Sequence, residues 1–222
     1  RQMCIRDSAK PVPKSSSKSE RILDAAEALF AIRGYDGVTM RQIASRAGVD
    51  VALANYHFGR KIDVFNAVFE RRADLLNTSR LSALREYQRD AGPEGPSVEQ
   101  IIEAFLRPLK MALGAADEGW TNYLALIAYV NNSPVWGKSM MSSLFDELVS
   151  EFIAALKQAL PKAREEDIYW CYQNLSGALT LTFAQTGRID KLSNGKCRSD
   201  DLEAAYATMI PFIAAGFTRV CG

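Results

Sequence analysis

The stretch TMRQIASRAGVDVALANYHF, residues 39–58, carries two helix start signals close together. Thr39 and Gln42 have the spacing of a capping box, in which two side chains satisfy the first free amides of a helix. Gly48 can end that helix in a left-handed conformation, and Asp50 can cap the next one. The stretch therefore predicts two short helices joined by a tight turn.

This pattern is typical of a helix-turn-helix. The second helix must project far enough to enter a DNA major groove, which is about 12 Å wide, while the first crosses behind it and braces it. Small residues at Ala44, Ala47 and Gly48 allow the helices to cross closely. Residues 1–80 carry a net charge of +5 and residues 81–222 a net charge of −4, a weak electrostatic footprint for nucleic acid. The alternative interpretation is a plain corner between two helices of a bundle.

Helix signals continue on both sides of this stretch. Upstream, Ser17 and Glu20 have the spacing of another capping box. An apolar helical stripe follows them: Ile22, Ala25, Ala26, Leu29 and Phe30. Gly34 is expected to end this helix. Downstream, a longer helix is expected to open near Lys61.

The rest of the chain is also expected to be helical, because strand alternation is absent. Helices are predicted at residues 98–114, 119–131, 137–160, 164–187 and 199–220. Pro108 and Pro211 lie inside two of these and should kink or split them. The predicted fold class is all-α: a disordered tail (1–18), an N-terminal three-helix helix-turn-helix domain (19–65) and a larger helical ligand-binding and dimerisation domain (66–222).

Composition excludes several classes of protein. The 222 residues are 48% hydrophobic and 24% charged, with a formal net charge of +1, which is ordinary for a soluble protein. No apolar run approaches the roughly 18 residues that a membrane span requires, and no secretory signal is visible. The four cysteines are widely spaced: Cys4, Cys171, Cys197 and Cys221. They favour inert thiols in a reducing cytoplasm over disulfides, with redox sensing by the last three as the less favoured alternative.

Four sequence blocks resemble, in order and spacing, those of the TetR family of bacterial transcription regulators. They are residues 21–30 (RILDAAEALF), 34–44 (GYDGVTMRQIA), 47–50 (AGVD) and 55–61 (NYHFGRK). Together they cover nearly all of residues 19–70. The remaining two-thirds of the chain is matched only as an all-helical body.

The resemblance implies which residues meet DNA. The residues expected to contact phosphates are Thr39, Tyr56, His57 and Lys61. At the start of the second helix, Arg41 and Gln42 can reach a base edge or a phosphate. The exposed face of the recognition helix comprises Val51, Ala52, Leu53 and Asn55. Chemistry supports two of these roles. The Asn55 amide can pair with adenine in bidentate fashion. Lys61 is a cation at a helix start, where the dipole disfavours it, so a nearby anion would rationalise it.

Some residues depart from the family pattern or allow another interpretation. Val51 and Leu53 stand where polar residues are common in the family, so hydrogen-bond readout of bases is expected to be thin. His57, the single histidine, could instead be a structural residue near a helix end. Neither a Ser/His/Asp arrangement, nor a P-loop, nor an HExxH motif occurs in the sequence, so we expect no enzyme activity, no cofactor and no metal.

Bulky apolar residues gather in the middle helices. We expect them to line a cavity, together with one polar residue that would orient a ligand: Phe105, Trp120, Tyr123, Met140, Met141, Phe145, Trp170 and Asn174. The alternative is an ordinary packed core. Few charges occur in residues 120–132, which favours a hydrophobic ligand over a charged one.

The last two predicted helices are too apolar for lone surface helices. Paired across a two-fold axis they would form a four-helix bundle, and the resemblance implies the same homodimer. A charge at Leu175 or Ile213 is expected to break it. The function expected is a cytoplasmic repressor that a hydrophobic ligand releases from a palindromic operator in double-stranded DNA. The alternative is an all-helical small-molecule binder or enzyme with a vestigial DNA-binding head.

Overall fold

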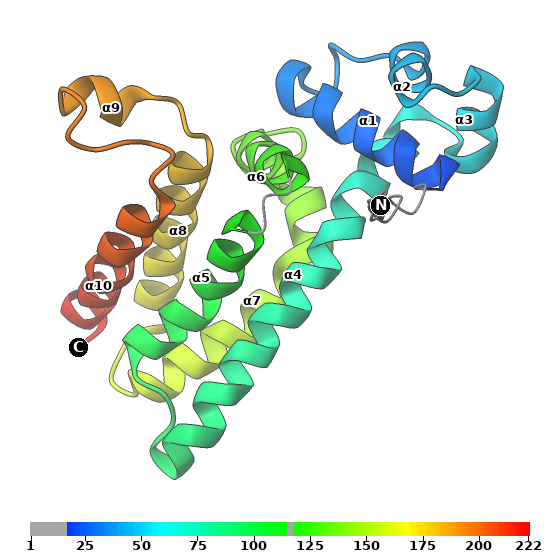
Figure 1. The fold of residues 1–222 in the computed structure, drawn as a ribbon. Coiled ribbons are helices and arrows are strands. Elements are labelled where there is room, and N and C mark those ends of the chain that lie inside the picture. Colours follow the sequence, from blue (N-terminus) through cyan, green and yellow to red (C-terminus); the bar gives the residue numbers. More distant parts are fainter. Residues whose placement is uncertain (1–16, 115–117) are drawn as a thin grey trace, which may run out of the picture.

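The structure is a computed structural model that describes residues 17–114 and 118–222, and every regular element in these ranges is a helix (Figure 1). The all-α fold class is therefore confirmed. Residues 1–16 of the predicted tail lie outside the described residues. Lys18 already begins the first helix, because the Ser17 hydroxyl accepts a hydrogen bond from the Glu20 amide (3.1 Å).

Three helices form the head of the molecule: α1 (Lys18–Arg33), α2 (Met40–Ala47) and α3 (Val51–Phe58). The capping box predicted at the start of α2 is present. The Thr39 amide donates to Gln42 Oε1 (2.9 Å), and the Gln42 amide donates to Thr39 Oγ1 (3.3 Å). The predicted helix-turn-helix is therefore confirmed with its expected bounds.

The turn between α2 and α3 depends on a glycine. Gly48 has φ +63°, a conformation that side chains rarely adopt, and a Cβ at this position would lie 2.8 Å from Arg21 Nη2. The Arg21 guanidinium donates to the carbonyl oxygens of Ala47 and Gly48, so α1 holds the turn in place. Asp50 then caps α3, accepting from the Ala52 amide (2.7 Å).

The head and the body share one helix, α4 (Lys61–Ala91), which is 31 residues long. Its first turns bury Val64 and Phe65 with the head, and its later turns bury Leu76 and Leu84 in the body. The domain boundary expected after residue 65 therefore lies inside a continuous helix rather than in a linker. Because α4 is continuous, a movement of its body end would also move the turns that pack in the head.

Most of the body is built from helices that pack alongside α4 (Figure 1). Helices α5, α8 and α10 form a layer in which α10 packs on both α5 and α8. Helix α7 lies against α4, and α6 contacts α1 of the head. The bounds are η1 (Gly92–Glu94), α5 (Val98–Gly114), α6 (Glu118–Asn131), η2 (Gly137–Met141), α7 (Ser142–Ala159), α8 (Glu165–Phe183), α9 (Arg188–Leu192) and α10 (Leu202–Cys221).

Two details of these helices go beyond the prediction. Neither proline splits its helix, since α5 runs through Pro108 and α10 through Pro211. The helix predicted from residue 137 is continuous, but its first turn, η2, is a π-helix.

One described helix, α10, is long and apolar enough to cross a membrane by length and composition alone. A core helix of a soluble protein passes the same test, so a single such helix is weak evidence. In this fold one face of α10 is buried in the body, through Tyr206, Met209, Ile213 and Phe217. Its other face is left without a cover in the single chain.

Two of the cysteines that are distant in sequence meet between α8 and α10. The Sγ atoms of Cys171 and Cys221 lie 3.9 Å apart, and both residues are buried. Burial raises the pKa of the Cys171 thiol to about 11. This thiol is therefore protonated at neutral pH and poorly reactive, as expected for an inert cysteine.

Candidate nucleic-acid interface and effector cavity

The recognition helix α3 presents a short outward face. Ala54 is fully buried against the head, whereas Ala52, Asn55 and His57 are exposed and Tyr56 is 84% exposed. A tyrosine this exposed on a rigid helix has little packing role to explain it. The Asn55 amide, the Tyr56 hydroxyl and the His57 imidazole are thus polar groups that α3 offers to a partner.

Two predicted members of the recognition face are less free. Val51 is half-buried and packs against the core of the head. It therefore offers less surface to DNA than Asn55 does, and its place on the exposed recognition face stays a prediction. Leu53 is also only half-exposed.

The start of α2 carries the other predicted DNA contacts. Arg41 is exposed, and Thr39 and Gln42 are exposed while they cap the helix through each other. Capping uses the Gln42 side-chain oxygen and leaves its amide nitrogen outward. This end of α2 can therefore offer donors and one cation to a phosphate or a base edge.

Lys61 makes contacts within the protein that the sequence did not predict, while its predicted phosphate contact stays a prediction. Its Nζ donates to the carbonyl oxygens of Tyr35 (2.9 Å) and Val38 (3.0 Å) and lies 4.0 Å from the centroid of the Tyr35 ring. The anion expected beside this lysine is thus replaced by two backbone carbonyls and an aromatic face. Lys61 fastens the start of α4 to the turn that follows α1.

Replacing Lys61 with methionine tests this role. The two carbonyls lose a charged donor, so the free energy of unfolding should fall by about 1–3 kcal/mol. The salt dependence of DNA binding should hardly change. Arg41→Met is the matched variant, since loss of an exposed phosphate contact lowers the salt slope by about one unit. Urea unfolding measures the stability of the two variants, and salt titrations of duplex binding measure their salt slopes. If Lys61→Met lowers the slope without affecting stability, Lys61 is a phosphate contact after all.

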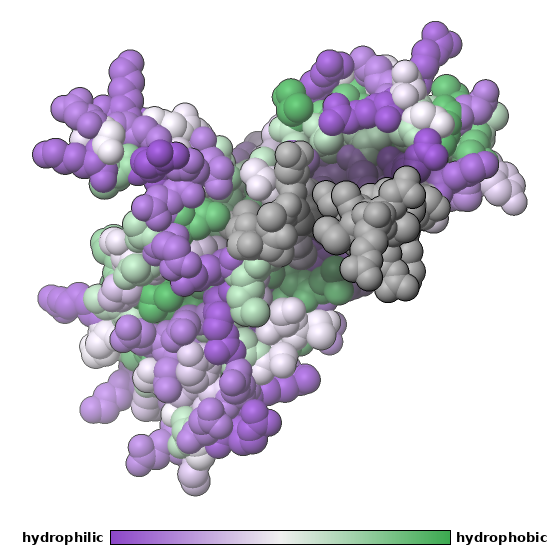
Figure 2. All heavy atoms as spheres, viewed as in Figure 1, coloured by the Kyte–Doolittle hydropathy of each residue, from purple (hydrophilic) through white to green (hydrophobic). Residues whose placement is uncertain are grey.

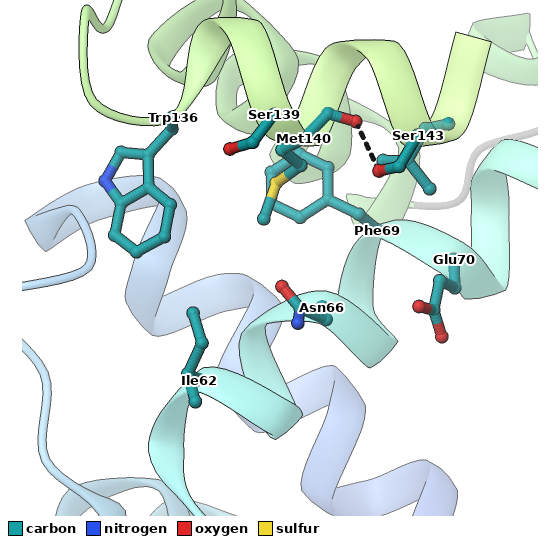
Figure 3. Close-up of a pocket in the computed structure, with 9 residues that line it drawn as sticks. Ile62, Asn66, Phe69, Glu70, Trp136, Ser139, Met140 and Ser143 are labelled. Carbon is teal, nitrogen blue, oxygen red and sulfur yellow. Dashed lines mark hydrogen bonds between the residues drawn. The ribbon is translucent and has the colours of Figure 1, made fainter.

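Aromatic rings connect the head to the body. Trp136, which precedes η2, lies 4.9 Å from the Tyr35 ring and 5.4 Å from the Phe65 ring, measured between centroids. Figure 3 shows Trp136 and Met140 on one wall of an open pocket and Ile62, Asn66 and Glu70 of α4 on the other. This pocket has a volume of about 270 Å³.

A buried ion-pair cluster forms a second connection. Glu27 of α1 accepts from Arg71 Nη2 (2.8 Å) and Arg72 Nε (2.8 Å) of α4, and Arg71 also pairs with Asp24 (2.7 Å). The guanidinium carbon of Arg72 lies 4.9 Å from the centroid of the Trp120 ring in α6. Three helices of the head and the body therefore meet at Glu27.

A largely apolar cavity of about 50 Å³ lies in the body between α4, α5, α6, α7 and α8. Most of its wall is hydrocarbon or aromatic, with one charged residue, Arg80. The lining comprises Leu76, Arg80, Phe105, Leu109, Leu124, Ile127, Asn131, Met141, Phe145, Leu148, Val149, Tyr172, Ser176, Leu179, Thr180 and Phe183. Of the eight residues predicted to bind a ligand, Phe105, Met141 and Phe145 lie in this wall.

The structure places the other five predicted residues elsewhere. Trp170 is 69% exposed and Asn174 is also exposed, because they fall on the outer side of α8, off the inward stripe. Tyr123 is buried, with its ring 6.0 Å from that of Phe69. Trp120 packs on Arg72 at the seam with the head, and Met140 lines the open pocket instead.

Arg80 is the cavity residue that the sequence interpretation missed. It occupies a position on the apolar stripe of α4, one turn after Leu76 and one turn before Leu84. A charged residue at a core position of an otherwise regular stripe is the signal that could have found it. Ser176 was also missed, whereas its partner Asn131 is a possible polar anchor by sequence; the two side chains bond to each other (2.9 Å).

A braced helix-turn-helix with an exposed recognition face, continuous with an all-helical body, defines a DNA-binding regulator of the helix-turn-helix class. Residues 22–68 match the family model described as bacterial regulatory proteins, tetR family. Residues 103–216 match the model for the tetracyclin repressor-like C-terminal domain. The chain therefore belongs to the TetR family, whose members are DNA-binding transcription regulators and not enzymes.

Two curated relatives are similar to this chain over part of their length. The transcriptional activator FasR of Mycolicibacterium smegmatis is 30% identical over 94 residues, which cover 42% of this chain and 41% of FasR. The transcriptional regulator SrpR of Pseudomonas putida is 35% identical over 97 residues, which cover 44% of this chain and 42% of SrpR. The matched stretch thus spans less than half of either relative.

Solved structures share the fold over most of the chain. The fatty acid degradation regulator FadR from Bacillus halodurans has a TM-score of 0.57 at 20% identity and covers 89% of this chain and 96% of its own. FadR from Bacillus subtilis, in complex with stearoyl-CoA, has a TM-score of 0.59 at 15% identity and covers 89% and 98%. At these identities the likeness concerns the fold alone.

Proposed function

We propose that this chain is a repressor that dimerises, binds a palindromic operator and leaves it when an apolar small molecule enters the body. The observation that supports this proposal best is the position of the apolar cavity. Its wall includes Met141, the last residue of η2, and the residue that precedes η2 is Trp136, which packs on the head. A ligand that displaces η2 therefore acts on the element that holds the head.

The volume of the cavity supports an effector that moves helices. Pockets for small molecules commonly measure about 300 Å³ or more, whereas this cavity measures about 50 Å³. A ligand larger than a few atoms must push the wall outward. Because α7 and η2 form one continuous rod against α4, that movement would change the seat of Trp136 between Tyr35 and Phe65.

The π-helical turn suits this role. A π turn holds one more residue than an α turn and often marks a functional site, because it can convert to α-helix with a local shift in register. In η2 this turn places Met140 towards the open pocket and Met141 towards the cavity. Flexible methionine side chains fit ligands of differing shape.

The proposed dimer uses the outer faces of α8 and α10. Figure 2 shows hydrophobic residues at the surface in the region of these two helices. The large exposed apolar residues on them are Tyr169, Trp170, Leu181, Phe212 and Val220. Leu175 and Ile213 are only 2% and 6% exposed in the single chain, so a charge there would disrupt the core rather than report on the dimer. The variants proposed from the sequence must therefore move to the outer face.

The experiment that tests the repressor model combines an operator with a ligand panel. Duplexes selected from a random pool provide the operator, and apolar molecules are titrated into the complex while fluorescence anisotropy follows the DNA. Effective ligands should weaken DNA binding by about 5-fold to 150-fold, the usual range of allosteric coupling. If molecules bind tightly and none changes DNA affinity, the effector model is wrong. Tightening of the complex would instead indicate co-repression.

Trp136→Ala should uncouple the two sites. The variant loses the ring contacts with Tyr35 and Phe65 but keeps the cavity, so the ligand affinity should stay within about twofold of wild type. The factor by which the ligand changes DNA affinity should fall to about one, because coupling needs an element that both sites bias. Tyr129→Ala in α6 is a matched control, because that ring also faces the head, at Gly34, yet does not adjoin η2 in the chain as Trp136 does. Equal coupling in Trp136→Ala and wild type would contradict the route through η2.

A further inference from the structure

Arg80 is a charged side chain inside an apolar wall. It is 5% exposed, lies on α4 and lines the cavity. Its Nε donates to the Phe105 carbonyl oxygen (2.9 Å), and its guanidinium carbon lies 3.9 Å from the centroid of the Phe105 ring. Among the described residues a hydrogen-bond partner is found for Nε alone, and the two terminal nitrogens are not fully buried, so a ligand in the cavity can reach them.

Within residues 17–114 and 118–222 no carboxylate forms an ion pair with Arg80. This separates Arg80 from Arg71 and Arg72, which meet Glu27. Burial lowers the pKa of Arg80 to about 10, so the group still carries its charge at neutral pH. A buried charge without a counter-charge is strongly unfavourable, and proteins normally pair it.

The tyrosines around Arg80 add neutral O–H groups rather than a counter-charge. The phenolic oxygens of Tyr123 and Tyr206 are buried and have no hydrogen-bond partner. Both rings, together with Tyr172 of the cavity wall, lie close enough to Arg80 to interact with its charge. Burial raises the pKa of Tyr123 and Tyr206, so each keeps its O–H as a donor.

Two other polar side chains of the wall bond within the protein. Asn131 Nδ2 donates to the Ser176 hydroxyl (2.9 Å), and the Thr180 hydroxyl donates to the Gly177 carbonyl (3.0 Å). Their oxygens are neutral acceptors and bring no negative charge. The cavity wall therefore combines hydrocarbon with one positive charge and no carboxylate.

We propose that the effector is an organic anion, in which a carboxylate pairs with the Arg80 guanidinium and an apolar chain lies between α6, α7 and α8. This deepens the proposed function by naming the ligand class for the same cavity. A carboxylate matches the planar fork of arginine with two parallel hydrogen bonds. The apolar side chains of Leu124, Ile127 and Phe145 leave no partner for a second charge.

This ligand class refines the expectation from the sequence. The small number of charges in residues 120–132 favours an apolar ligand, and those residues do form an apolar part of the wall. The charge that selects one end of the ligand comes from α4 instead, about forty residues earlier in the chain. An uncharged ligand would leave Arg80 buried without a counter-charge.

The test compares acids with their methyl esters at matched chain length. Hexanoate, octanoate, decanoate and dodecanoate, each below its micelle-forming concentration, are titrated into the full chain by calorimetry beside the four esters. A hydrogen-bonded charge pair should make the best acid bind at least about tenfold tighter than its ester. If no acid binds, or if acid and ester bind equally, the proposal is overturned.

Three variants assign the preference to one residue. Arg80→Met should remove it, with the fold retained because buried charges are often replaced by apolar side chains without loss of stability. Arg80→Lys should keep part of the preference for the acid, so the role of the charge can be tested even if the methionine variant misfolds. Arg85→Met removes an exposed arginine of the same helix and should leave the preference intact. A tenfold preference that survives in Arg80→Met contradicts the assignment.

The outcomes also separate this proposal from the repressor model. If decanoate binds through Arg80 and the operator complex is unchanged, the anion site stands and the release mechanism fails. If esters release the operator as well as acids do, release stands and the anion site fails. If high-resolution density shows only a water on Arg80 at saturating decanoate, Arg80 is a structural cation and the proposal is wrong.

Discussion

Glu27→Ala should lower the free energy of unfolding by about 3–5 kcal/mol, the usual penalty for removing one partner of a buried ion pair. Glu27 is 1% exposed and is the acceptor shared by Arg71 and Arg72. Its loss withdraws the carboxylate while both guanidinium groups stay in place. Urea unfolding followed by circular dichroism measures the change.

Two further variants distinguish the charge from the packing. Glu27→Gln keeps the shape and one acceptor, so it should be less harmful than Glu27→Ala. Gly119→Ala reaches the same cluster from α6, because a Cβ there would collide with the terminal nitrogen of Arg72. Asp24→Ala is the control, since its carboxylate is largely exposed, and exposed pairs contribute about 1 kcal/mol or less. Wild-type stability of Glu27→Ala would contradict this account of the cluster.

Phe212→Glu should convert the dimer to monomers and weaken operator binding by about 100-fold to 10,000-fold, the range lost when two linked binding sites are separated. Phe212 is 73% exposed on α10, and α8 and α10 together also expose Tyr169, Trp170, Leu181 and Val220. Several exposed apolar side chains on neighbouring helices indicate an interaction surface, whereas a single one does not. Analytical ultracentrifugation and anisotropy with the selected duplex report the two effects.

The control for Phe212→Glu is Met111→Glu. Met111 is similarly exposed, at 70%, but lies on α5, away from the proposed interface. It should remain dimeric and bind the operator at wild-type strength. Circular dichroism must show that both variants fold. A Phe212→Glu protein that stays dimeric at micromolar concentration would place the interface on another face.

The head could be predicted from the sequence because its signals are local. Ser17, Thr39 and Asp50 are caps whose partners lie two or three residues away, so short windows contain the whole interaction. The same holds for Gly48, whose φ of +63° follows from its place between two helices. Element bounds in the head accordingly match the expectation closely.

The cavity could be predicted only in part, because its walls come from five helices. Residues on one helix can be assigned to a common face, as Phe145 and Met141 are, but the rotation of α8 about its axis is set by packing. That rotation turns Trp170 and Asn174 outward. The internal contacts of Lys61 were missed for a similar reason: its carbonyl partners lie 23 and 26 residues earlier in the chain.

The measurement that tests the central claim most directly is selection of bound duplexes from random DNA by the purified full chain, followed by anisotropy with wild type and Asn55→Ala. The account predicts an enriched inverted repeat whose half-sites are centred about 10 base pairs apart, or a multiple of that spacing. It also predicts that Asn55→Ala loses about 1–3 kcal/mol at one base position of each half-site. No enriched sequence, or equal binding of selected and random duplexes, would contradict it.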